Sequence, residues 1–102
     1  MRNSTVLITG ASSGFGLASA QLFAARGWNV VATMRDPAAG AALAGPDVLV
    51  ARLDVQDRDS IAAAIDAGIA RFGAIDALVN NAGFGLFGVF ESTPRAKIQE
   101  QF

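Results

Sequence analysis

The chain of 102 residues has no cysteine, no histidine and no tyrosine, and its single lysine is Lys97. Without cysteine, these residues cannot form a disulfide or a thiolate metal site. Without histidine and tyrosine, they lack most of the side chains that transfer protons near neutral pH. The chain therefore holds few groups that could act on a substrate, and no metal site is predicted.

Charge of one sign is not concentrated anywhere, and long hydrophobic runs are absent. The formal net charge is −1 and the arginines are spread along the chain, so a nucleic-acid partner is not expected. No apolar run approaches the roughly 20 residues of a membrane span, and the first residues lack the pattern of a signal peptide. We therefore expect no membrane partner and a cytoplasmic setting.

Two features predict that the chain is truncated. Hydrophobic residues make up 52% and the mean hydropathy is +0.39, high values for a free-standing domain of this length. A helix expected to begin at Thr93-Pro94 runs to Phe102 without a residue that would end it. The alternative is a minimal four-stranded domain with a frayed last helix.

Short apolar runs alternate with longer segments of helical period. Strands are expected at Thr5–Thr9, Asn29–Thr33, Val48–Leu53 and Ile75–Val79. Because these runs are apolar almost throughout, they predict parallel strands that are buried on both faces. The predicted fold class is α/β: a Rossmann-type, doubly wound parallel sheet of four strands in the order 3-2-1-4, with an uncovered edge at the fourth strand.

Three segments predict the helices that connect these strands. The first covers Gly14–Arg26 and ends at Gly27, and a short one covers Pro37–Ala44. The third begins after the cap residue Asp57 and ends at Gly73. The expected buried faces are Ala18, Leu22 and Ala25 in the first helix and Ile61, Ile65, Ile69 and Phe72 in the third.

The strongest functional signal is the segment Thr9–Gly16, which reads Thr-Gly-Ala-Ser-Ser-Gly-Phe-Gly directly after the first apolar run. A strand followed by spaced glycines and a helix is typical of a phosphate-binding turn. Gly10 permits the turn, Gly14 lets a pyrophosphate approach, and Gly16 allows close helix packing. The positive helix end and the two serine hydroxyls would then face the anion. The alternative is a turn that only packs helix on strand.

Two further motifs follow later strands. Leu53-Asp54-Val55 comes after the third strand, and Asn80-Asn81-Ala82-Gly83 comes after the fourth. Ligands of open α/β sheets bind at this edge, although either motif alone could be an ordinary turn. With Thr9–Gly16, the two motifs resemble the classical short-chain dehydrogenase/reductase family. The resemblance implies that residues 1–102 are the N-terminal part of a single NAD(P)-binding Rossmann domain whose catalytic half is absent.

The resemblance also implies a role for each motif. The glycine turn would hold the cofactor pyrophosphate, Asp54 would accept a hydrogen bond from the adenine amino group, and the fourth strand would lead to the ribose and nicotinamide. The matching positions are Gly10, Ser12, Ser13, Gly14, Phe15 and Gly16 in the turn, Asp54 and Val55 after the third strand, and Asn81, Ala82 and Gly83 after the fourth. Thr9 and Asn80 are expected to bond across the sheet.

The residues after the second strand predict the choice of cofactor. The acid that selects NAD in this family would fall at about Met34, which carries no charge. Arg35 follows, and a guanidinium can bind the 2′-phosphate of NADP, with help from Ser13. NADP is therefore predicted over NAD. The alternative is that Asp36 binds the ribose 2′-hydroxyl and Arg35 is a solvated charge.

Catalysis in the family would use a Ser, a Tyr and a Lys four residues after the Tyr. No catalytic residue is assigned here, so the chain alone is predicted to be inactive. The complete enzyme would transfer a hydride between nicotinamide and a small alcohol or ketone, and a homo-oligomer is the assembly considered for it. A non-catalytic nucleotide sensor or degenerate remnant is the alternative, and an S-adenosylmethionine-binding protein is a weaker one. The apolar segment Phe84–Phe90 is predicted as a loop covered by the missing half, and the alternative that the resemblance implies is a border of the substrate pocket.

Overall fold

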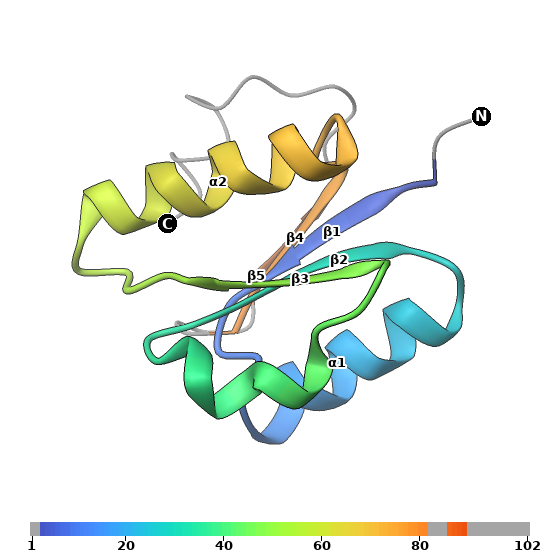
Figure 1. The fold of residues 1–102 in the computed structure, drawn as a ribbon, viewed down its shortest axis with the longest axis horizontal. Coiled ribbons are helices and arrows are strands. Elements are labelled where there is room, and N and C mark those ends of the chain that lie inside the picture. The colour runs from blue at the N-terminus through green and yellow to red at the C-terminus, as the bar shows by residue number, and fades with distance from the viewer. Residues whose placement is uncertain (1–2, 82–85, 90–102) are drawn as a thin grey trace.

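The computed structural model describes residues 3–81 and 86–89, which form one sheet with helices on both faces (Figure 1). The strands are β1 (Thr5–Ile8), β2 (Asn29–Met34), β3 (Val48–Arg52), β4 (Ala77–Asn80) and β5 (Leu86–Val89). The helices are α1 (Gly14–Ala25), the short 3₁₀ helix η1 (Pro37–Leu43) and α2 (Arg58–Phe72). The strand order across the sheet is β3-β2-β1-β4-β5.

The four predicted parallel strands and their order are confirmed. β1 pairs in parallel with β2 and β4, and β2 pairs in parallel with β3. The predicted caps of α2 are confirmed as well: the Asp57 carboxylate accepts from the Ser60 amide at 3.3 Å, and Gly73 ends the helix at φ 93°. Gly27 has φ 85° just after α1, as its expected role as a helix stop requires.

The core forms two layers, one on each face of the sheet. Figure 1 shows α1 and η1 below the sheet and α2 above it. Successive residues of β1 point to opposite faces, so Val6 and Ile8 pack toward α1 while Leu7 packs toward α2. On the α2 side, Ile61 and Ile65 are buried as predicted. The sheet is thus fixed from both sides, and its strand ends are held in place.

The buried face of α1 differs from the prediction. Gly16 and Ala20 face the sheet, whereas Ala18 and Ala25 are exposed and the Leu22 side chain is 54% exposed. This helix is rich in small and apolar residues on all sides, so the spacing of apolar residues did not identify the buried side. The two smallest residue types lie where the helix approaches the sheet most closely.

The outer edge of β4 also differs from the prediction. β5 pairs with β4 in antiparallel fashion, with Leu78 opposite Gly88 and Asn80 opposite Leu86. The predicted loop Phe84–Phe90 therefore contains a strand, and the expectation of an uncovered edge at the fourth strand was wrong. The backbone groups of β4 gain hydrogen-bond partners on this side. The helix expected from Thr93 lies outside the described residues.

Among residues 3–81 and 86–89, no helix combines the length and the apolar character needed to cross a membrane.

Candidate nucleotide site

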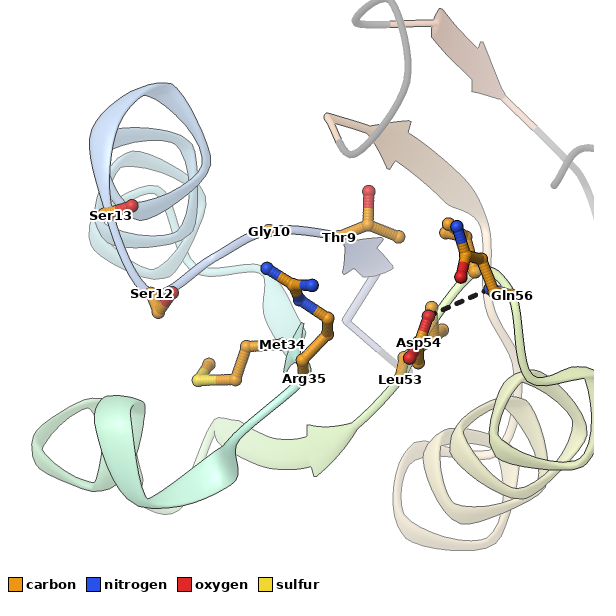
Figure 2. A pocket seen from close by; sticks show the side chains of 10 residues that line it. Thr9, Gly10, Ser12, Ser13, Met34, Arg35, Leu53, Asp54 and Gln56 are labelled. Atoms are coloured by element: carbon orange, nitrogen blue, oxygen red, sulfur yellow. Dashed lines mark hydrogen bonds between the residues drawn. The ribbon is translucent and has the colours of Figure 1, made fainter.

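A cleft of about 440 Å³ opens at the carboxyl ends of β1, β2 and β3 (Figure 2). This is the edge at which ligands bind in open α/β sheets. The volume lies within the range of small-molecule sites. The residues that line it are Thr9, Gly10, Ser12, Ser13, Met34, Arg35, Leu53, Asp54, Val55 and Gln56.

One wall of the cleft is the glycine turn between β1 and α1. Gly10 and Gly14 have φ values of 62° and 58°, a left-handed conformation that strains residues with a side chain. Ser13 is the N-cap of α1, yet its side chain makes no capping hydrogen bond, and the first turn contains no acidic residue. The free amide groups and the positive helix end on this wall suit an anion.

The turn is held by two close contacts. The Ala11 amide donates to the Thr33 carbonyl of β2 at 3.0 Å. On the other side, Gly16 packs so closely on Gly10 that a Cβ at Gly16 would overlap the Gly10 carbonyl oxygen. The same Cβ would lie 3.0 Å from the side-chain nitrogen of Asn81, so Asn81 lies against the helix start. These contacts fix the shape of the phosphate-facing wall.

The predicted bond across the sheet between Thr9 and Asn80 is confirmed. The Thr9 hydroxyl donates to the Asn80 side-chain oxygen at 3.1 Å, and both residues are buried. This contact ties the end of β1 to the end of β4. It anchors the glycine turn to the neighbouring strand, and Thr9 itself is one of the residues that line the cleft.

Arg35 and Asp36 have different surroundings at the end of β2. Arg35 lines the cleft, and Figure 2 shows its guanidinium pointing toward Gly10. It forms no ion pair with another residue of the described part of the chain. Asp36 is the N-cap of η1, and its carboxylate accepts from the Ala38 amide at 3.1 Å. Arg35 therefore lies in the cleft, whereas Asp36 caps η1 and is not one of the residues that line the cleft.

The opposite wall of the cleft is the turn after β3. The half-buried Asp54 carboxylate accepts from the Gln56 amide at 3.0 Å, shown as the dashed line in Figure 2. The Val55 side chain is 42% exposed beside it. The cleft thus carries a cation and free amide donors at one end and a carboxylate with an apolar neighbour at the other.

A surface ion pair, Arg52–Asp57, flanks the turn after β3. Arg52 donates to the Asp57 carboxylate at 3.2 Å. That hydrogen bond, with the Ser60 amide as the next contribution, lowers the pKa of Asp57 below its ordinary value of 3.8. Both side chains are about half exposed, so the pair adds little stability at neutral pH.

The predicted site residues divide into three groups. Gly10, Ser12, Ser13, Arg35, Asp54 and Val55 line the cleft. Gly14, Phe15, Gly16 and Asn81 lie outside its lining, and Phe15 is 68% exposed at the start of α1. Ala82 and Gly83 lie outside the described residues.

Sequence reasoning missed Gln56 and the wall formed by Met34. Gln56 is two residues beyond Asp54 and carries no charge, so it gave no signal of its own. Met34 was considered only as a position without an acid, yet its buried side chain lines the cleft and contacts Gly40 of η1. Its place at the end of β2, on the ligand-binding edge, is the signal that could have identified it.

Comparison with known proteins agrees with this geometry. Residues 4–102 match the short chain dehydrogenase family. Retinol dehydrogenase 8 of Bos taurus is 43% identical over 109 residues, covering 96% of this chain and 34% of that protein. Galactitol 2-dehydrogenase of Agrobacterium fabrum is 40% identical over 104 residues, covering 99% of this chain and 39% of that protein.

Solved structures give the same result. A 3-ketoacyl-(acyl-carrier-protein) reductase from Brucella melitensis, complexed with NADH, has a TM-score of 0.71 and 36% identity. The match covers 76% of this chain and 33% of that one. The chain thus spans about a third of the length of the proteins it matches. It belongs to the short-chain dehydrogenase family.

Proposed function

We propose that the chain is the NADP(H)-binding portion of a short-chain oxidoreductase that transfers a hydride between nicotinamide and an alcohol or ketone. Residues 1–102 would form the N-terminal part of a single NAD(P)-binding Rossmann domain. The bound cofactor would supply the hydride chemistry, and this chain would bind and orient its adenosine side. The names of the matched relatives, a retinol and a galactitol dehydrogenase among them, support a small alcohol or ketone as substrate.

The observation that carries this proposal is the opposite polarity of the two ends of the cleft. The glycine turn, the α1 N-terminus and Arg35 suit phosphate groups, while Asp54 and Val55 suit the amino group and the face of a purine. A dinucleotide is anionic at its phosphates and presents a hydrogen-bond donor at its adenine. The chemistry of the cleft therefore fits the adenosine half of a nicotinamide cofactor.

The choice of NADP over NAD rests on Arg35. Two similar solved structures contain NADH or NAD, which supports a nicotinamide dinucleotide without setting the preference of this chain. Arg35 lines the cleft without an ion-pair partner among the described residues, and Asp36 is engaged at the start of η1. A guanidinium in this position favours a ribose that carries a phosphate over one that carries a hydroxyl.

The catalytic step is assigned to residues outside this sequence, since the chain contains no tyrosine. The 102 residues alone are expected to show no oxidation of NADPH with any ketone. A cytoplasmic setting and a homo-oligomer complete the proposal, and neither nucleic acid nor a membrane is expected as a partner. If the protein as its gene encodes it binds NADPH without turnover on any alcohol or ketone, a nucleotide sensor replaces the enzyme.

Binding of NADPH and NADH to wild-type protein and to Arg35→Ala tests the cofactor assignment. Loss of a charge-assisted hydrogen bond costs about 1.5–3 kcal/mol, so NADPH affinity should fall about 10- to 100-fold while NADH affinity changes little. Arg26→Ala is the matched control, because Arg26 is an exposed arginine after the other end of α1. Titration calorimetry gives both affinities.

Asp36→Asn distinguishes the alternative assignment. If Asp36 binds the ribose 2′-hydroxyl, this variant should lose NADH affinity, and Arg35→Ala should leave the ratio of NADPH to NADH affinity unchanged. That pattern would show that the protein selects NAD. Wild-type protein that binds neither nucleotide would refute the proposed function as a whole.

A further inference from the structure

Ser60 is a buried polar residue in the first turn of α2, and it does not line the cleft. Its hydroxyl forms hydrogen bonds with both the amide and the carbonyl of Asp54. The hydroxyl oxygen accepts from the Asp54 amide at 2.9 Å. The hydroxyl proton is directed at the carbonyl oxygens of Asp57 and Asp54, at 2.7 and 3.0 Å. Ser60 is 6% exposed, so water is a poor substitute for these contacts.

These bonds connect the cleft-facing turn to the start of the helix. The Asp57 amide donates to the Asp54 carbonyl at 2.9 Å, which closes the turn between them. The Asp57 carboxylate in turn accepts from the Ser60 amide. The backbone of Asp54 is therefore held through its amide and its carbonyl by residues of the α2 N-terminus. Neither Asp57 nor Ser60 touches the cleft, so both act on a ligand only through Asp54.

The orientation of the Asp54 carboxylate follows from this backbone. One carboxylate oxygen accepts from the Gln56 amide at 3.0 Å. The second oxygen accepts no hydrogen bond from any other described residue. Figure 2 shows the side chain at the edge of the cleft with the Gln56 contact drawn. A fixed acceptor with one free oxygen is suited to a single donor on a ligand.

We propose that Ser60 is a positioning residue that fixes the Asp54 carboxylate and thereby sets the selectivity of the cleft for an amino-bearing purine. This inference rests on the proposed nucleotide function. Adenine presents an amino group, which donates to a carboxylate. Hypoxanthine presents a carbonyl oxygen in the same place, which the carboxylate repels. Discrimination between the two bases requires that the carboxylate stays in one place, and the Ser60 bonds provide that constraint.

The test compares NADPH with its hypoxanthine analogue, using the protein as its gene encodes it. Wild-type protein should bind NADPH at least about tenfold more tightly than the analogue, because the Asp54 carboxylate loses its donor and faces the carbonyl oxygen of the analogue instead. Ser60→Ala should lower this ratio toward one, mainly through weaker NADPH binding. Ser60→Thr keeps the hydroxyl and should keep the ratio. Ser19→Ala, a half-buried serine of α1, is the matched control and should not change it.

The ratio separates a positioning role from a purely structural one. A Ser60→Ala protein that melts earlier but keeps the wild-type ratio would overturn the inference. Asp54→Asn combined with Ser60→Ala should lower the ratio no further than Asp54→Asn alone, since Ser60 acts through Asp54. Should Ser60→Ala fail to fold, Ser60→Cys fills the site with a slightly larger side chain that forms weaker hydrogen bonds, and it serves the same comparison.

Two other outcomes concern the function itself. Wild-type protein that binds both dinucleotides equally would show that Asp54 does not read the base, and the inference would fall while the proposed function stands. Wild-type protein that binds neither dinucleotide would refute both the inference and the proposed function.

Discussion

Replacement of Gly16 by alanine tests whether the glycine turn is held by close packing or only by turn conformation. A Cβ at this position would overlap the Gly10 carbonyl oxygen and lie 2.7 Å from the Gly10 carbonyl carbon. It would also lie 3.0 Å from the Asn81 side-chain nitrogen. The first two atoms belong to the backbone, which cannot move aside by changing a rotamer. We therefore expect Gly16→Ala to displace the turn or the helix.

Two opposing effects determine the sign of the change in stability. Alanine is favoured over glycine inside a helix by about 1 kcal/mol. Overpacking a tight contact costs typically about 1–3 kcal/mol, and a contact with backbone lies at the upper end of that range. The expected net effect is a loss of about 1–2 kcal/mol. For a domain of this size, that loss lowers the thermal midpoint by roughly 5–15 °C.

Thermal unfolding and NADPH titration of the same samples provide the assay. Ala18→Gly is the control, because Ala18 is exposed on the same helix and reports the propensity difference without a steric contact. Gly16→Ala should lower both the midpoint and the NADPH affinity, since Gly10 lines the cleft. Ala18→Gly should lower the midpoint alone. A Gly16→Ala protein that melts higher than wild type would refute the close-packing argument.

Two further predictions concern residues around the cleft. A Cβ at Gly40 would overlap the thioether end of Met34, so Gly40→Ala should push that flexible side chain into the cleft and weaken NADPH binding about tenfold, or about 1.4 kcal/mol, by calorimetry. Gly45→Ala, with no heavy atom within 4 Å of the added Cβ, should leave affinity unchanged; equal affinities for both variants would refute this. The pKa of Asp57 is lowered by Arg52, so its contribution to stability is present above pH 3.8 and is lost as the pH falls through its folded pKa. The midpoint advantage of wild type over Asp57→Asn should therefore shrink between pH 6 and pH 3, and a constant difference would contradict it.

The parallel sheet could be predicted because its strands carry strong local signals. β1, β2 and β4 are mostly apolar and are buried. Each is followed by residues that predict a turn or a helix, and the structure has a turn or a helix there. The cap at Asp57 and the left-handed stop at Gly73 are likewise local, so one or two residues suffice to predict them. Features that depend only on neighbours in sequence were thus accessible without the structure.

Features that depend on contacts between residues far apart in the sequence could not be predicted from the sequence. The exposed face of α1 includes Leu22, and no amphipathic pattern distinguishes it from the side that packs on the sheet. β5 forms because the edge of β4 offers it a partner, and a short apolar segment does not reveal by itself whether such an edge is near. For the same reason the bonds of Ser60 to Asp54 were invisible, since a serine at this position is also a common helix-start residue.

The two candidate ligands of the ribose are coupled through η1. Asp36 caps this short helix by accepting from the Ala38 amide, and Pro37 begins it. Asp36 does not line the cleft, so its carboxylate would have to turn to reach a ribose hydroxyl there. A turn that breaks its bond to the Ala38 amide would cost about 1 kcal/mol. Arg35 has no ion pair to give up within the described residues and already lines the cleft. Binding of a 2′-phosphate by Arg35 therefore leaves η1 intact, whereas such a turn of Asp36 weakens the helix that packs against Met34. This difference supports the proposed preference for NADP.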